Sequence, residues 1–291
     1  MNHAPLLRAS LLLLGSAAPR AAQALALLAP GLALAQGQKL NGPLPTPGSG
    51  DVLSVQVSTD GARAVYRAVH FLPGGDSVRA LTSAPLGGGS PVVLNTPLHD
   101  VLDFALAPAG GLVVYRAEHD SPSATELYSA PVDGSSASVR LNAPLGAGGE
   151  VSEFRISPDG SRVVFLANQA SGQPLQLFGA PTDGSSAAVE LDGALTPAFA
   201  LNPGVPRFLL AGNTHVLFLV DALADDRREL FSAPLDGSAP PIQLTGPIFS
   251  SPEQYMAQHS FEFRVSADGA RVVYRSDELV PPRDELLSVP T

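Results

Sequence analysis

Charged side chains recur at corresponding places in this 291-residue sequence. An acidic and a basic residue stand two apart at Glu153/Arg155 and at Glu262/Arg264, and Asp103 stands at the matching place in a third segment. Carboxylates and guanidinium groups placed close together could form a pocket for a polar ligand. They could equally neutralise one another as ion pairs that seal the space between them, and such pairs are often structural.

A second set of basic residues occupies one column of the same pattern. Arg67, Arg116 and Arg275 follow an apolar strand segment, where two other copies have Leu166 and Leu219. A guanidinium can hold a carboxylate or a sugar acid through two parallel hydrogen bonds. Pairing with acidic loops nearby is the more common use, and exposed pairs of that kind contribute little stability.

Nucleophilic and metal chemistry find little support in the residue types. Cysteine is absent, no G-x-S-x-G turn occurs, and no histidine stands at metal-ligand spacing. We therefore expect no cofactor and no metal site. Carboxylates on inner strands leave a glycosidase-like or lyase-like site open. However, an arginine two residues after Glu153 and Glu262 favours the ionised carboxylate, whereas a general acid must hold its proton.

A repeat that runs along the chain must position these residues. Its five copies read as strand, tight turn, strand, and the turn usually contains Asp-Gly, as at Asp60, Asp159 and Asp268. Asp before Gly is what a tight turn selects, so we interpret these aspartates as structural. The copies are 57–66, 106–115, 156–165, 209–218 and 265–274. Each ends in an aromatic residue that we expect in the core between sheets.

Two more strand segments follow each copy. The first contains Leu-x-Ser-Ala-Pro or a close variant, as at 127–131, and the second ends in a motif such as Leu141-Asn142-Ala-Pro-Leu145. Four short strands in about 50 residues match one blade of a β-propeller. The sequence therefore predicts an all-β fold, a five-bladed propeller of four-stranded antiparallel blades. The expected blades are 51–98, 99–145, 146–195, 196–248 and 249–291.

The last expected blade, 249–291, has only three strand segments. Residues 38–44 repeat the ending of the fourth strand, so we expect them to complete the last blade and close the ring, which leaves no long unpaired edge. On each innermost strand two residues should project toward the central channel. These pairs are Ser54/Gln56, Asp103/Ala105, Glu153/Arg155, Pro206/Phe208 and Glu262/Arg264.

The turn Ser157-Pro-Asp-Gly160 followed by the apolar strand Ser161–Phe165 resembles the repeat of TolB-like propellers. The resemblance covers nearly all of the chain after residue 35 and implies the propeller fold, but it says little about function. Proteins named TolB carry an α/β domain before a six-bladed propeller. Here about 15 residues lie between the expected cleavage site after residue 35 and the first blade, and five blades are expected, so the resemblance implies neither TolB itself nor its envelope partner.

The N-terminal segment has the character of an export signal. Residues 1–35 contain no acidic residue, include apolar runs after Arg8 and Arg20, and end in Ala33-Leu34-Ala35. We interpret this segment as a cleaved signal peptide, which leaves 36–291 as one domain in the periplasm or outside the cell. No segment reaches the length of a transmembrane helix. The net charge of −10 and a single lysine exclude a nucleic-acid-binding surface.

Three functions remain open: binding, catalysis, and a purely structural role of the repeat, which the sequence does not exclude. The long loops that join second to third strands, and one blade to the next, should share one face of the propeller, where function often lies. The first hypothesis is a non-catalytic, monomeric protein that binds a protein or envelope component through this face. The alternative is an enzyme that acts on carbohydrate or peptide in the central pocket. The candidate ligand-binding residues are Asp103, Glu153, Arg155, Glu262, Arg264, Arg67, Arg116 and Arg275.

Overall fold

The computed structural model shows an all-β protein. It describes residues 37–41, 51–71, 76–95, 100–108, 110–118, 124–193, 195, 208–220, 229–245, 263–276 and 285–291. The chain divides into two units, 1–38 and 39–291, and all strands belong to the second. The predicted signal segment 1–35 lies outside the described residues. The described part of the chain contains no helix that could cross a membrane.

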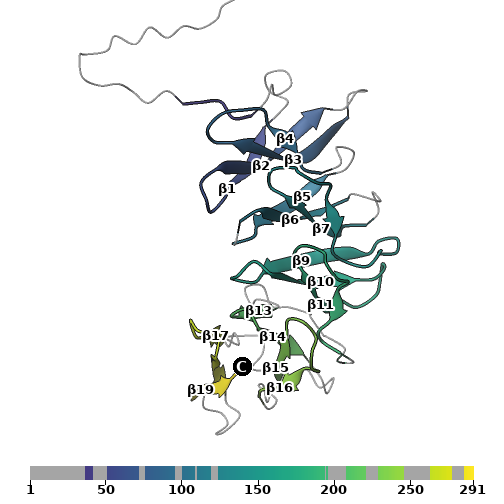
Figure 1. Cartoon of the computed structure of the whole chain (residues 1–291). Helices are drawn as coiled ribbons and strands as arrows, with labels where there is room; N and C mark the ends of the chain where they lie inside the picture. Colours follow the sequence, from purple (N-terminus) through teal and green to yellow (C-terminus); the bar gives the residue numbers. More distant parts are fainter. Residues whose placement is uncertain are drawn as a thin grey trace, which may run out of the picture. The chain divides into compact units, whose positions relative to one another are not determined.

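In the part of the chain that the structure describes, nineteen strands form five antiparallel sheets whose strands follow one another in chain order (Figure 1). The first sheet contains β1 (Val52–Val57), β2 (Arg63–Phe71), β3 (Ser77–Pro85) and β4 (Val92–Val93). The second contains β5 (Val101–Leu106), β6 (Leu112–Ala117), β7 (Glu126–Pro131) and β8 (Val139–Arg140). The third contains β9 (Glu150–Ile156), β10 (Arg162–Asn168), β11 (Gln176–Pro181) and β12 (Val189–Glu190).

The last two sheets continue the pattern. The fourth contains β13 (Phe208–Ala211), β14 (His215–Val220), β15 (Glu229–Pro234) and β16 (Ile242–Gln243). The fifth contains β17 (Phe263–Val265), β18 (Arg271–Ser276) and β19 (Glu285–Pro290), and it is three-stranded. Residues 37–41 are not part of a strand, and Leu40 packs against Tyr66, Ala68 and Ala84 of the first sheet.

The Asp-Gly turns connect the first two strands of a sheet as expected. In the third sheet Asp159 accepts hydrogen bonds from the Ser157 hydroxyl at 2.6 Å and from the Ser161 amide at 3.0 Å, while Gly160 has a φ of 75°. Asp60 and Asp268 accept the corresponding bonds in their own turns. These bonds lower the pKa of all three carboxyl groups, the serine hydroxyl having the largest effect. The structural interpretation of these aspartates is confirmed.

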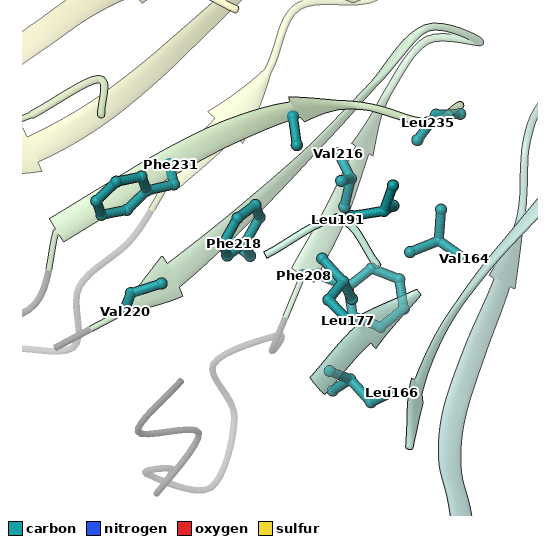
Figure 2. Packing of buried hydrophobic residues seen from close by; sticks show 11 residues of the cluster. Val164, Leu166, Leu177, Leu191, Phe208, Val216, Phe218, Val220, Phe231 and Leu235 are labelled. Atoms are coloured by element: carbon teal, nitrogen blue, oxygen red, sulfur yellow. The ribbon is translucent and has the colours of Figure 1, made fainter. Parts of the chain in front are cut away.

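Large apolar side chains fill the space between neighbouring sheets. Figure 2 shows the cluster between the third and fourth sheets, in which Phe208, Phe218 and Leu177 are fully buried. Phe218 stacks on Phe231 with ring centroids 6.0 Å apart. All five aromatic residues of the column are buried, so their assignment to the core is confirmed: Tyr66, Tyr115, Phe165, Phe218 and Tyr274.

Candidate functional site

A cavity of about 870 Å³ lies along the first strands of the second, third and fourth sheets. Its walls include Asp103 on β5, Arg116 on β6, and Glu153 and Arg155 on β9. The structure therefore brings four of the eight candidate ligand-binding residues to one cavity. Because β5, β9 and β13 are edge strands of their sheets, the cavity also has backbone groups in its wall.

Arg116 and Asp103 form an ion pair within the second sheet. The arginine donates from Nε to Oδ1 at 2.9 Å and from Nη2 to Oδ2 at 2.6 Å. Its Nη1 donates to the backbone oxygens of Val151 at 2.9 Å and Ser152 at 2.5 Å. The guanidinium thus joins the second sheet to the first strand of the third sheet, and both carboxylate oxygens of Asp103 are engaged.

Arg67 makes the matching contact one sheet earlier. Its Nη1 donates to the backbone oxygen of Val101 at 3.3 Å. Val101 pairs with Ala117, and Val151 pairs with Ala167, so the two acceptors occupy equivalent register positions. This arginine column therefore contacts the backbone of the next sheet, whereas the sequence had suggested acidic loops or a ligand.

Glu153 and Arg155 form the second ion pair at the cavity. Arg155 donates from Nη2 to Glu153 Oε1 at 3.0 Å, and both side chains stay partly exposed. The guanidinium carbon of Arg155 also lies 5.6 Å from the ring centroid of Phe208. This distance permits a cation–π interaction, which ties the third sheet to the fourth.

The remaining candidates belong to the fifth sheet. Arg264 pairs opposite Val273, the same register as Arg155 opposite Val164, and its Nη1 donates to Phe263 O at 3.0 Å. Arg275 lies on β18 opposite Leu286. Neither lines the cavity along β5, β9 and β13. Glu262 lies outside the described residues.

The expected register of the fourth sheet is wrong by one residue. Phe208 pairs with Phe218, just as Phe154 pairs with Phe165, and Phe208 is fully buried. Leu209, opposite Leu217, occupies the place that Arg155 has in the third sheet. Phe208 therefore belongs to the core column and not to the channel, because its ring fills the space between sheets. Pro206 lies outside the described residues.

Sequence reasoning overlooked a neutral side chain on the first inner strand. Gln56 donates from Nε2 to the backbone oxygen of Phe104 at 3.1 Å, and its Oε1 accepts from the Leu106 amide at 3.1 Å. The carboxamide thus pairs with the free edge of β5 as the N–H and C=O of one residue on a neighbouring strand would. The sequence predicted that Gln56 faces the channel. That its carboxamide covers the edge of β5 follows only from the structure.

A buried acid outside the cavity was also missed. Asp192 is fully buried, its Oδ2 accepts from the Leu177 amide at 2.9 Å, and its Oδ1 has no hydrogen-bond partner. Burial raises its pKa to about 7. The signal in the sequence was the column Asn95, Asn142, Asp192 and Thr245, in which one member is acidic.

No group of three or more acidic or histidine side chains that could hold a metal ion occurs within the described ranges. Most loops of the predicted long-loop face lie outside those ranges. The candidate site that can be described is therefore the cavity, with its two ion pairs and its strand edges.

Comparison with known proteins found matches among solved structures. No family model and no curated protein matches the sequence. Among solved structures, the chain is similar to the propeller domain of the Trilobed protease from Pyrococcus furiosus, described as having an open velcro topology. The identity is 10%, the match covers 82% of this chain and 69% of that one, and the TM-score is 0.47.

Two further structures share the architecture. One is a putative TolB from Agrobacterium tumefaciens, at 21% identity, 64% and 62% coverage and a TM-score of 0.34. The other is an oligogalacturonate lyase in complex with manganese, at 14% identity, 84% and 66% coverage and a TM-score of 0.45. These neighbours are β-propeller proteins, and one is TolB-like. The predicted resemblance is confirmed, and at these identities it shows the fold alone.

Proposed function

We propose that this chain is an exported β-propeller protein that binds a ligand in the cavity along β5, β9 and β13 without transforming it. The observation that carries the proposal is that the acidic side chains of the cavity are already paired with arginines. Both oxygens of Asp103 are engaged by Arg116, and Glu153 is paired with Arg155. Groups committed to structural ion pairs shape and line a binding site, whereas catalysis needs an acid or base that can exchange its proton.

Site-specific photo-crosslinking tests this proposal. The photoreactive residue p-benzoylphenylalanine is placed at Leu209 in the cavity wall, or at Ile242 on the outer strand β16 as a control. We expect ultraviolet light in the producing cells to give one dominant adduct at Leu209 and none at Ile242. Equal labelling at both positions, or no adduct at either, would contradict a ligand in the cavity.

Export remains part of the proposal because of the signal-like pattern of residues 1–35. A periplasmic or extracellular location fits this pattern, and a monomeric state stays a prediction. Binding of a protein or envelope component through the long-loop face stays a prediction, as does a contribution of Glu262, Arg264 and Arg275 to ligand binding.

We also propose that the five sheets are the blades of one ring, in which the fifth sheet and residues 38–44 meet the first sheet. The two end sheets have complementary exposed positions. Leu286 on β19 is 78% exposed, although the equivalent Leu81, Leu127, Leu177 and Leu230 are all fully buried against the following sheet. Val55 on β1 is 59% exposed, although the equivalent Phe104, Phe208 and Phe263 are buried against the preceding one.

Polar contacts point to the same closure. Asn95 and Asn142 accept the amides of Leu81 and Leu127, and the equivalent pair is Asn41 with the Leu286 amide. Arg67 and Arg116 donate to Val101 and Val151, and Arg275 would reach Val52 in the same way. In a closed ring the fifth sheet would then contact the first sheet in the same way as the first sheet contacts the second.

The substitution Leu286→Glu tests closure, because its effect depends on whether Leu286 is buried. A closed ring predicts a loss of about 2–5 kcal/mol in the free energy of unfolding, as for other buried leucines that are replaced. The control is Ile242→Glu, at a position that is 55% exposed. Equal stability of the two variants, with the protein monomeric in both, would contradict closure.

A further inference from the structure

The inner edges of the second and third sheets differ in one respect. On β5 the edge is covered, because the Gln56 carboxamide pairs with Phe104 O and Leu106 N–H. On β9 the equivalent groups are Phe154 O and Ile156 N–H. Phe154 pairs opposite Phe165 and Ile156 opposite Val163, as Phe104 pairs opposite Tyr115 and Leu106 opposite Val113.

The residue that would cover β9 is too short to do so. Gln56 lies opposite Val65 and Ala105 lies opposite Val114, so Ala105 is the equivalent of Gln56 in the second sheet. Its methyl group can neither donate nor accept a hydrogen bond. Phe154, Ile156 and Ala105 all line the cavity of about 870 Å³. The cavity therefore lies beside Ala105 at the place where the first sheet has the carboxamide of Gln56.

The open part of the edge is short. Arg116 occupies the backbone oxygens of Val151 and Ser152 at the other end of β9. The segment from Phe154 to Ile156 then offers one acceptor and one donor, which is the complement of the N–H and C=O of one residue on a parallel strand. Leu209, Leu210 and Pro158 add apolar wall around it.

We propose that the cavity binds an extended polypeptide segment by pairing its backbone with β9. One ligand residue donates its N–H to Phe154 O and accepts from Ile156 N–H through its own C=O. Main-chain pairing of this kind supplies affinity, and the surrounding wall selects side chains. The inference rests on the proposed function, since it names the ligand class for the same cavity.

The substitution Ala105→Gln tests this pairing, because the new side chain would cover β9 as Gln56 covers β5. Purified protein, immobilised, selects from an equimolar library of N-acetylated, C-amidated hexapeptides, and the retained peptide is titrated by calorimetry. We expect Ala105→Gln to weaken binding by about tenfold or more, since two hydrogen bonds are lost. Ala105→Met adds similar bulk without an amide and is expected to weaken it less than about threefold by the same reasoning.

A second variant, Gln56→Ala, removes the carboxamide that covers the edge of β5. We expect this variant to bind peptide at two sites, the original one at β9 and a new one at β5. Equal peptide affinity in the wild type, Ala105→Gln and Ala105→Met would overturn backbone pairing.

Chitotetraose and tetragalacturonate are titrated in parallel. Binding of either glycan with no retained peptide would overturn the ligand class and leave the proposed cavity function standing. Absence of all binding to the wild type would overturn both.

Discussion

The outer and inner ends of the sheets follow different rules. At the outer end, the second residue after the fourth strand accepts the amide of the leucine in the third strand in all four complete sheets, at 2.8–3.0 Å. The acceptors are Asn95, Asn142, Asp192 and Thr245. At the inner end, the equivalent positions of the same four sheets hold four different residues, namely Gln56, Ala105, Arg155 and Leu209, and the fifth sheet repeats the arginine at Arg264. A contact repeated in every sheet maintains the fold, whereas a position that changes from sheet to sheet is free to define a site.

Removing a repeated core residue should have the largest effect. Phe218 is fully buried and stacked on Phe231. Phe218→Ala is expected to lower the free energy of unfolding by about 3–5 kcal/mol in guanidinium denaturation. Leu210→Ala, at a partly buried inner position, serves as the matched control and should cost less. A larger loss for Leu210→Ala would contradict the view that the repeated core maintains the fold more than the inner strands do.

The acidic member of the outer column makes stability depend on pH. Because burial raises the pKa of Asp192 from 3.8 to about 7, the folded state holds a proton that the unfolded state releases between these values. Wild-type stability should therefore decrease as pH rises from about 4 to about 7, by up to about 4 kcal/mol at 1.4 kcal/mol per pKa unit.

Asp192→Asn should remove this dependence and stabilise the protein at pH 8, because Asn142 already fills the equivalent place and donates to Ala143 O at 2.7 Å. Denaturation curves at pH 5 and pH 8 measure both effects. An Asp192→Asn variant less stable than the wild type at pH 8 would show that the ionised carboxylate is tolerated.

The arginine column should have an intermediate effect. Arg116→Leu removes the contacts with Asp103, Val151 and Ser152. The third and fourth sheets, however, already have a leucine at the equivalent position, Leu166 and Leu219. We expect a loss of about 1–3 kcal/mol. Arg67→Leu, which loses one longer contact, should cost less. If Arg116→Leu left stability unchanged but abolished ligand binding, Arg116 would be a ligand-binding residue and not a structural bridge.

The smallest effect is expected in the Asp-Gly turns. Ser157→Ala removes the hydroxyl that contributes most to lowering the pKa of Asp159. The pKa of Asp159 should rise toward its ordinary value, which NMR titration of the carboxyl group can follow. Stability should fall by about 1 kcal/mol, because the hydroxyl of the buried Ser157 also accepts a hydrogen bond from the Arg162 amide at 3.0 Å. An unchanged pKa would mean that the amide and hydroxyl of Ser161, which also donate to Asp159, are enough to lower it.

Much of the fold follows from local patterns. The Ser157-Pro-Asp-Gly160 turn and the aromatic column around Phe165 are short-range signals, so strand order and core could be predicted from the sequence. The slip at Phe208 arose because the turn between β13 and β14 is one residue shorter than in the third sheet: Ala211 pairs with His215, whereas the equivalent Ser157 is bonded to Arg162. The open edge of β9 could not be predicted at all, since Phe154 O and Ile156 N–H are backbone groups that every sequence has.

Amide hydrogen exchange in the free protein tests the difference between the two inner edges most directly. The Leu106 amide is bonded to Gln56 Oε1, whereas the equivalent Ile156 amide faces the cavity. We predict that Ile156 exchanges at least about tenfold faster than Leu106, and that Gln56→Ala brings Leu106 to the rate of Ile156. Equal protection of the two amides in the wild type would mean that the β9 edge is already covered, and would contradict the ligand site proposed there.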